Sequence, residues 1–296
     1  MRECGELRGR SSEAWMPRVD VNGIGIYCEE HGSGPPVVMI GGLGADTSLW
    51  SKQVPAFSER LRVVVFDNRG AGRSDAPDEP YSIPMFAADT VDLMRALGIE
   101  RAHVVGASLG GLIAQELTLR HPEMVDRLVL VCTTSNGPKS VRPSLWSLIP
   151  ILFRLRRTGD AAADTRRAFS VFAHRKWLAA NPDEVEEFVA WRVAHPQPRH
   201  AFRRQRGAIR GFHTEDRLHM ISSPTLIVHG DSDRVVPAAN ARVLGRLIPN
   251  AEVLILEESG HACSFDQRDR FNEAVLGFLT ARREGVAWSA SVVRWG

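Results

Sequence analysis

Long apolar runs and paired cysteines are both missing from this chain of 296 residues. No stretch approaches the roughly 18 consecutive apolar residues that a membrane-spanning helix needs. Residues 1–15 also lack the apolar run of a secretory signal, so we expect a cytoplasmic protein without a membrane span. The four cysteines follow no CxxC spacing, which predicts reduced thiols and no structural zinc.

An excess of charge of either sign is also absent. The formal net charge of +2 is too small to indicate a nucleic-acid partner. Hydrophobic residues make up 44% of the chain and charged residues 24%, which is the usual balance of a globular protein with a large core. We therefore expect one domain with an insertion.

Short apolar runs alternate with amphipathic helical patterns along most of the chain. An opening hairpin is predicted at Asn22-Gly23, followed by a turn at 31–36. The later runs are bounded by glycine and polar turns, which favours a mostly parallel sheet of about eight strands with helices on both faces. The predicted strands after the hairpin are 37–40, 62–67, 102–107, 127–133, 225–230 and 252–258, and the predicted helices near them are 48–58, 84–97, 109–120, 238–247 and 268–283.

Residues 137–215 contain no convincing strand. A structureless loop of that length is improbable inside a compact domain, so we predict a helical cap with helices near 144–157, 162–179, 183–194 and 199–211. This segment has thirteen arginines and two lysines against seven acidic residues. Either these cations bind an anionic substrate, or they form the solvated face of helices that pack on the core, which is the interpretation we favour.

The chain divides accordingly into four parts. They are a leader expected to be disordered (1–15), a core (16–136 and 216–283), the helical cap (137–215) and a C-terminal tail (284–296). Trp288 and Trp295 in the tail could pack against the body or against a second subunit, so a homodimer stays open.

The strongest chemical signal is Gly106-x-Ser108-x-Gly110, placed between an apolar strand and an amphipathic helix. A serine on such a sharp turn adopts a strained backbone, and the small residues on either side leave room for it. The start of the helix directs backbone N–H groups to the same place, so the Leu109 N–H can stabilise negative charge on a substrate oxygen. A helix N-cap serine is the alternative.

A serine hydroxyl needs a general base, and His261 follows the predicted strand 252–258 closely enough to supply it. The acid that orients the base is expected after the preceding strand, where Asp231 and Asp233 are both candidates. We choose Asp233, because Asp231 directly follows Gly230 and is placed to hydrogen-bond the turn itself.

The order Ser108, Asp233, His261, each after a successive predicted strand, resembles the α/β-hydrolase family over about residues 17–283. The resemblance extends to the family's cap-bearing esterase, lactonase and C–C hydrolase branches. It implies that the acid is the last residue of a G-x-x-D pattern, which here ends at Asp233.

Two further segments resemble parts of that family. MIGGLGADTSLW at 39–50 looks like its HG-x-G segment, which implies that the Leu43 N–H is the second oxyanion donor. Gly41 stands where histidine is common, a departure that removes one loop-stabilising hydrogen bond. DNRGAGRSD at 67–75 also looks familiar, and we expect its Asp67 and Arg69 to tie loops together rather than touch substrate.

The predicted reaction is hydrolysis of a small to medium carboxylic ester or lactone through an acyl-enzyme, without cofactor or metal. A serine nucleophile disfavours the dehalogenase and epoxide-hydrolase chemistries of the family. Hydrolysis of a C–C bond or an enol-lactone, with cap arginines binding a substrate carboxylate, remains an alternative. So do a cofactor-free haloperoxidase or perhydrolase and a non-catalytic ligand receptor. The predicted apolar roof of the pocket comprises Trp146, Leu148, Ile149, Leu152, Phe153, Phe169, Phe172 and Trp177.

Overall fold

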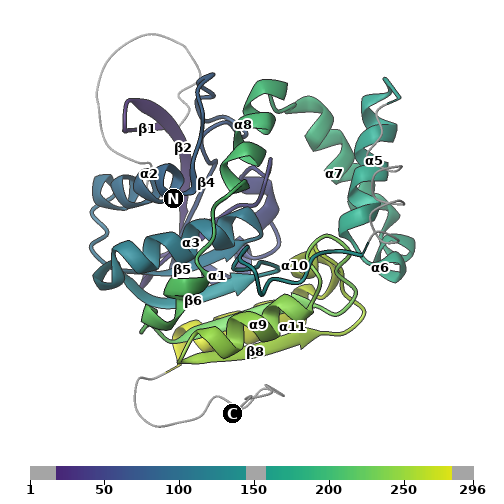
Figure 1. Cartoon of the computed structure of the whole chain (residues 1–296). Coiled ribbons are helices and arrows are strands. Elements are labelled where there is room, and N and C mark those ends of the chain that lie inside the picture. Colours follow the sequence, from purple (N-terminus) through teal and green to yellow (C-terminus); the bar gives the residue numbers. More distant parts are fainter. Residues whose placement is uncertain (1–17, 145–157, 282–296) are drawn as a thin grey trace.

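The computed structural model describes residues 18–144 and 158–281, and Figure 1 shows a sheet with helices around it. The sheet has eight strands in the order β1-β2-β4-β3-β5-β6-β7-β8. The pairs β1/β2 and β2/β4 are antiparallel and all later pairs are parallel, which confirms the predicted fold class. The strands are β1 (Arg18–Val21), β2 (Ile24–His31), β3 (Pro36–Ile40), β4 (Arg62–Phe66), β5 (Ala102–Ala107), β6 (Val125–Val131), β7 (Thr225–Gly230) and β8 (Ala251–Leu256).

The opening hairpin turns where the sequence predicts. Asn22 and Gly23 have φ values of 50° and 75°, and positive φ at both central residues is the requirement of a type I′ turn. The twist of that turn matches the twist of the two strands it joins. The hairpin thus brings β2 beside β4 at one side of the parallel strands.

Two layers of helix cover the sheet. Helices α2 (Ile83–Ala96), α3 (Leu109–Arg120) and α9 (Ala239–Leu247) pack into one apolar cluster, and α11 (Arg268–Thr280) packs with the short α1 (Val54–Phe57) into another. Successive residues of β5 divide between the two clusters, because side chains alternate across a strand: Val104 belongs to the first and Val105 to the second. The sheet is therefore buried on both faces.

Among the described residues, four cap helices lie between β6 and β7, and in Figure 1 α5, α6 and α7 stand to one side of the sheet. One helix is predicted over 162–179, but the chain there forms two, because Ala173 and His174 are extended and the His174 side chain accepts a hydrogen bond from Lys176 N. The predicted helix 144–157 falls almost wholly outside the described residues. The cap helices are α5 (Ala161–Phe172), α6 (Arg175–Ala180), α7 (Pro182–Ala194) and α8 (Arg199–Ile209).

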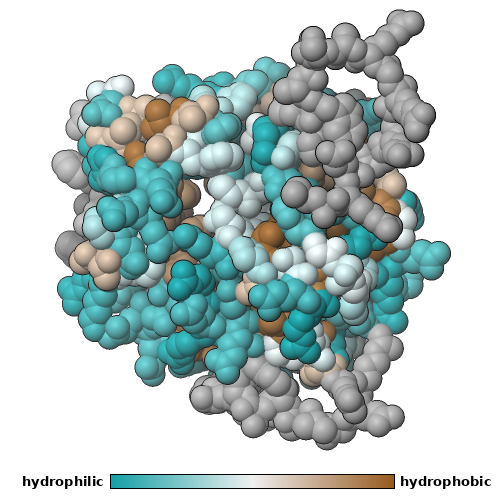
Figure 2. Space-filling model, turned by 180° about the vertical axis from the view of Figure 1, so that it is seen from behind, coloured by the Kyte–Doolittle hydropathy of each residue, from teal (hydrophilic) through white to brown (hydrophobic). Residues whose placement is uncertain are grey.

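Short elements complete the chain, and none of them is predicted as a separate unit by periodicity. They are η1 (Thr47–Trp50), η2 (Pro122–Met124), η3 (Glu215–Met220) and α10 (Cys263–Asp266). The leader 1–15 and the tail 284–296, with Trp288 and Trp295, lie outside the described residues. Within the described part of the chain, no helix combines the length and apolarity needed to cross a membrane. Figure 2 shows a mostly hydrophilic face with small, separate hydrophobic areas.

Candidate active site

Ser108 stands at the sharp turn between β5 and α3 and lines a pocket. Its backbone has φ 53° and ψ −112°, a conformation that costs energy for any residue with a side chain. Its own groups hold it there: the N–H donates to Val131 O at 2.9 Å, and the carbonyl accepts from Gly111 N and from Thr133 Oγ1. The serine side chain makes no cap hydrogen bond to α3, which argues against the N-cap alternative.

Two glycines let α3 approach the sheet at this turn. A Cβ at Gly110 would lie 2.2 Å from Ile40 O, and one at Gly106 would lie 2.3 Å from Gly110 O. Both clashes are with backbone atoms, which cannot rotate away. The glycines that flank the serine are therefore required by close packing.

We expect Gly110→Ala to lower the free energy of unfolding by about 3 kcal/mol, because the helix must move away from Ile40. Denaturant unfolding measures this. Gly207→Ala is the matched control, since Gly207 is helical and nothing lies within 4 Å of its missing Cβ. That substitution should raise stability by about 0.5–1 kcal/mol. Equal effects at both sites would contradict the close-packing argument.

His261 and Asp233 lie in the loops after β8 and β7 and contact one another directly. His261 Nδ1 is 2.7 Å from Asp233 Oδ2, and the Asp233 side chain is fully buried. Burial opposes ionisation of this carboxyl, but the charge of His261 and the hydrogen bonds from His229 and His261 hold its pKa well below the usual range. An ionised Asp233 accepts the Nδ1 proton and leaves Nε2 of His261 as the acceptor.

The other oxygen of Asp233 is fixed by the backbone, since Oδ1 accepts from Val235 N at 2.8 Å and Val236 N at 2.9 Å. Sequence reasoning missed His229, whose buried ring places Nε2 2.8 Å from Val236 O and 3.2 Å from Asp233 Oδ2. Asp231 instead accepts from Glu258 N and Ser259 N, the turn role expected of it. The structure thus brings Asp233 to His261 and keeps Asp231 apart.

The same cluster contains residue types that can bind a metal ion. Among the described residues, Cys132, His229 and Asp233 have potential ligand atoms within 4.8 Å of one another. Asp233 and His229 already use their oxygens and Nε2 in the hydrogen bonds above, and Cys132 Sγ lies 3.4 Å from Cys263 Sγ. His229 Nδ1 has no hydrogen-bond partner among the described residues, but both Asp233 oxygens are hydrogen-bonded and burial raises the pKa of the Cys132 thiol. The cluster therefore fits a hydrogen-bonded network better than a coordination shell, whose ligands must be deprotonated.

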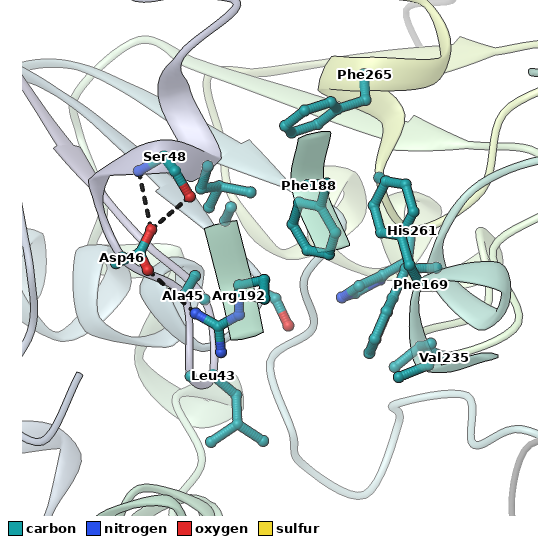
Figure 3. A pocket seen from close by; sticks show the side chains of 18 of the residues that line it. Leu43, Ala45, Asp46, Ser48, Phe169, Phe188, Arg192, Val235, His261 and Phe265 are labelled. Carbon is teal, nitrogen blue, oxygen red and sulfur yellow. Dashed lines mark hydrogen bonds and ion pairs between the residues drawn. The ribbon is translucent and has the colours of Figure 1, made fainter. Parts of the chain in front are cut away.

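A pocket of about 400 Å³ opens over Ser108 and His261. Five phenylalanines give it a predominantly apolar wall, and Figure 3 labels Phe169, Phe188 and Phe265 on the same side of the pocket as His261. Of the predicted roof, Phe169 and Phe172 line the pocket, whereas Trp177 packs edge-on against Phe169 behind it. Trp146, Leu148, Ile149, Leu152 and Phe153 lie outside the described residues. The phenylalanines are Phe169, Phe172, Phe188, Phe202 and Phe265.

The two predicted oxyanion donors, Leu43 and Leu109, belong to the two segments that meet at Ser108. Leu109 is the first residue of α3, where backbone N–H groups have no partner within the helix. Leu43 lines the pocket in the loop after β3. That loop comes directly against the serine, because a side chain at Gly42 would lie 3.4 Å from Ser108 Cβ.

The polar end of the pocket is a pair of opposite charges. Arg192 on α7 bonds the Asp46 carboxylate at 3.1 Å, and Asp46 also accepts from Ser48 N and Trp191 Nε1. Figure 3 shows Asp46, Ser48 and Arg192 across the pocket from His261. Arg192 is the one arginine or lysine among the described lining residues, and its charge is already balanced by Asp46.

The segment 67–75 holds loops together, as expected. Asp67 is fully buried and accepts from Thr47 N and Arg73 N, while Arg69 bonds both oxygens of Asp89. Neither Asp67 nor Arg69 lines the pocket. The hydrogen bonds of Asp67 and Arg69 therefore fix the conformation of the loop that follows β4.

The cap also holds the histidine loop. Asp266 on α10 accepts from Gly260 N at 2.6 Å and from His174 N at 3.0 Å, and Ala262 N donates to Phe172 O. Burial raises the pKa of Asp266 to about 6, with the two N–H donors opposing the shift and the charge of Asp233 adding to it. The loop that carries His261 is therefore fastened to the segment between α5 and α6.

Asp266 makes stability depend on pH in a defined direction. Its pKa is about 6 folded and 3.8 as a free side chain, so the folded state binds more protons between these values. The contribution of Asp266 to the free energy of unfolding is greatest below pH 4. It falls by about 3 kcal/mol as the pH rises through 6. We expect Asp266→Asn to gain thermal stability relative to the wild type from pH 4.5 to 7.5. Asp269→Asn, at an exposed carboxylate, should show no such trend.

The comparisons with known proteins agree with this architecture. The family described as alpha/beta hydrolase fold matches residues 35–267. The chain therefore belongs to the α/β-hydrolase family. It is 31% identical over 263 residues to a putative carbamate hydrolase, RutD, of Azorhizobium caulinodans, covering 89% of this chain and 98% of the relative.

Two solved structures share the fold over nearly their whole length. One is the enol-lactonase of Burkholderia xenovorans LB400, with a TM-score of 0.78, 27% identity, and coverage of 90% of this chain and 100% of that one. The other is a meta-cleavage product hydrolase of Pseudomonas fluorescens IP01, with a TM-score of 0.76, 28% identity, and coverage of 88% and 96%. This protein is therefore a hydrolase of the α/β fold.

Proposed function

We propose that this protein is a serine hydrolase that cleaves a carboxylic ester or a lactone through an acyl-enzyme. Ser108 is the nucleophile, His261 the general base and Asp233 the acid that orients it. The observation that carries the proposal is the 2.7 Å bond between His261 Nδ1 and the buried Asp233 carboxylate, in a pocket also lined by the strained Ser108.

The proposed reaction uses groups of this chain and water. His261 takes the Ser108 proton as the hydroxyl attacks the carbonyl carbon, and the N–H groups of Leu43 and Leu109 hold the oxyanion. His261 then protonates the leaving oxygen, which departs as an alcohol from an ester or stays attached to the acyl group from a lactone, and the acyl group is left on Ser108. Water attacks this acyl-enzyme with His261 again as base, and His261 returns the proton to Ser108 Oγ as the acid product leaves.

The pocket supports a neutral, apolar substrate group. Five phenylalanines surround the space beside Ser108, and aromatic walls bind alkyl or aryl groups by removing them from water. The charge of Arg192 is already balanced by Asp46 at 3.1 Å, so a substrate carboxylate would have to share the guanidinium with a carboxylate that is 2% accessible. This weighs against the alternative of a carboxylate-bearing C–C hydrolase substrate.

The test is covalent labelling with a fluorophosphonate, followed by peptide mass mapping. We expect one adduct, on the peptide that carries Ser108, because a fluorophosphonate reacts readily only with a serine that a general base activates. Heat-denatured protein is the control and should take no label. Absence of label on the folded protein would refute the proposal.

A substrate panel separates the possible acyl groups. We expect turnover of p-nitrophenyl butyrate and of an alkyl-substituted lactone, and weaker turnover of p-nitrophenyl hydrogen succinate, whose carboxylate meets the paired Arg192. A p-nitrophenyl carbamate belongs in the panel because of the relative described as a putative carbamate hydrolase. Preference for the succinate would favour the carboxylate-binding alternative.

A further inference from the structure

The loop that carries Leu43 contains a tight turn from Gly42 to Ala45. Ala45 N donates to Gly42 O at 3.2 Å, and Gly44 has φ +69°, so Leu43 and Gly44 are the central residues. The peptide between them takes no part in the turn's own hydrogen bond. Its Gly44 N–H is therefore open to a partner outside the turn, and such a partner anchors the turn together with the Leu43 N–H, which belongs to the preceding peptide.

Gln205, on cap helix α8, supplies that hold. Its side chain is fully buried, and its Oε1 accepts from Gly44 N at 2.9 Å. Its Nε2 donates to Arg69 O at 2.8 Å, and Gln197 Nε2 lies 3.1 Å from the same Oε1. The Gly44 N–H and the Arg69 carbonyl fix the orientation of the Gln205 amide. In the reversed orientation the NH₂ group would face the Gly44 N–H, and the amide oxygen would face the Arg69 carbonyl oxygen.

The rest of the loop is held from other directions. Asn68 Nδ2 donates to Gly41 O before the turn, and Asp46 after the turn is bound by Trp191 and Arg192. The central peptide itself is contacted through Gln205, which belongs to the cap and lies 161 residues along the chain from Gly44. The shape of the turn therefore depends on the docked cap helix.

We propose that Gln205 is a positioning residue that holds the turn Gly42–Ala45 so that the Leu43 N–H faces the oxyanion. This inference rests on the proposed function, because it assigns Leu43 an oxyanion and Ser108 a substrate. Gln205 does not line the pocket and touches no substrate. Its effect is on the transition state, in which the oxyanion forms, and not on binding of the neutral ground state.

Gln205→Met tests this with a side chain of similar length and no amide. We expect kcat for p-nitrophenyl butyrate to fall about 10–100-fold, while KM changes less than about threefold. An alkylboronic acid, whose tetrahedral adduct on serine places an oxygen where the oxyanion forms, should lose affinity by a similar factor. Binding of butyramide, a neutral ground-state analogue, should be unchanged.

Gln205→Glu is a second variant, and it is tested by the pH dependence of kcat, which a change in packing alone would not alter. The protonated carboxyl has the same donor and acceptor as the amide, whereas the ionised form places a lone pair against Arg69 O. We therefore expect its kcat, relative to that of the wild type, to rise as pH falls. Arg206→Met, on the exposed side of the same helix, is the control and should match the wild type at each pH.

The outcomes separate the two proposals. If the wild type neither takes the fluorophosphonate nor cleaves esters, the proposed function falls and this inference falls with it. If the wild type reacts while Gln205→Met keeps its kcat and boronate affinity, the function stands and Gln205 has no positioning role. If both Gln205 variants lose butyramide and boronate affinity equally, with no pH trend in Gln205→Glu, Gln205 only docks the cap and the inference is wrong.

Discussion

Replacing Ser108 with alanine is expected to lower kcat by about 10⁵-fold, or about 7 kcal/mol of transition-state stabilisation. The loss is large because the covalent route disappears entirely, and water in the pocket must attack without a preceding acyl-enzyme. The fold should be retained, because the backbone strain at Ser108 is held by Val131, Gly111 and Thr133 and not by its hydroxyl. Ester turnover and fluorophosphonate labelling measure the effect.

The control for this variant is Ser58→Ala. The Ser58 hydroxyl bonds the Pro55 carbonyl, and the residue does not line the pocket, so turnover and labelling should stay at the wild-type level. The oxyanion donors alone would leave Ser108→Ala with less than about 1% of the wild-type kcat. A higher kcat would show that the nucleophile is another residue.

The sheet and its helices are predictable because their signals are local. Each parallel strand is a short apolar run between polar turns, and the helix after β5 is predicted and observed at 109–120. The prediction of one helix over 162–179 is wrong because periodicity continues across His174, whereas the structure ends α5 at Phe172 and starts α6 at Arg175. Tertiary contacts of His174 with Asp266 decide that break.

The oxyanion loop shows what a local pattern leaves out. Gly41, where the related segment often has histidine, predicts the loss of one loop-stabilising hydrogen bond. In the structure Asn68 bonds the Gly41 carbonyl and Gln205 bonds the Gly44 N–H. Nothing in the sequence near Gly41 indicates Gln205, because that contact exists only after the cap has docked on the core.

The role of the basic residues in the cap could not be predicted from the sequence alone either. Composition leaves open whether the arginines bind an anion or lie on a solvated face. The described pairs favour the second interpretation: Arg166 bonds Glu186 on an exposed surface, Arg204 bonds Asp78, and Arg192 bonds Asp46 in the pocket. Two of these three partners belong to the core, far along the chain, so counting charges within the cap cannot find them.

The choice between two neighbouring carboxylates gives the second large expected effect. Asp233→Asn should lower kcat by about 10⁴-fold, while Asp231→Asn should lower it less than about tenfold. In the first variant the backbone donors Val235 N and Val236 N keep the Oδ1 position occupied by oxygen. The NH₂ group then faces His261 Nδ1, donates to it, and moves the imidazole proton to Nε2.

A histidine with its proton on Nε2 cannot accept one from Ser108, so the loss appears in kcat and in the rate of fluorophosphonate labelling, with binding of butyramide unchanged. Asp231 only accepts from Glu258 N and Ser259 N in the turn, and an asparagine oxygen can keep one of these bonds. Because both variants exchange a carboxylate for an amide within three residues, charge removal alone predicts equal effects. A larger loss from Asp231→Asn would assign the orienting acid to Asp231 and overturn the triad proposed here.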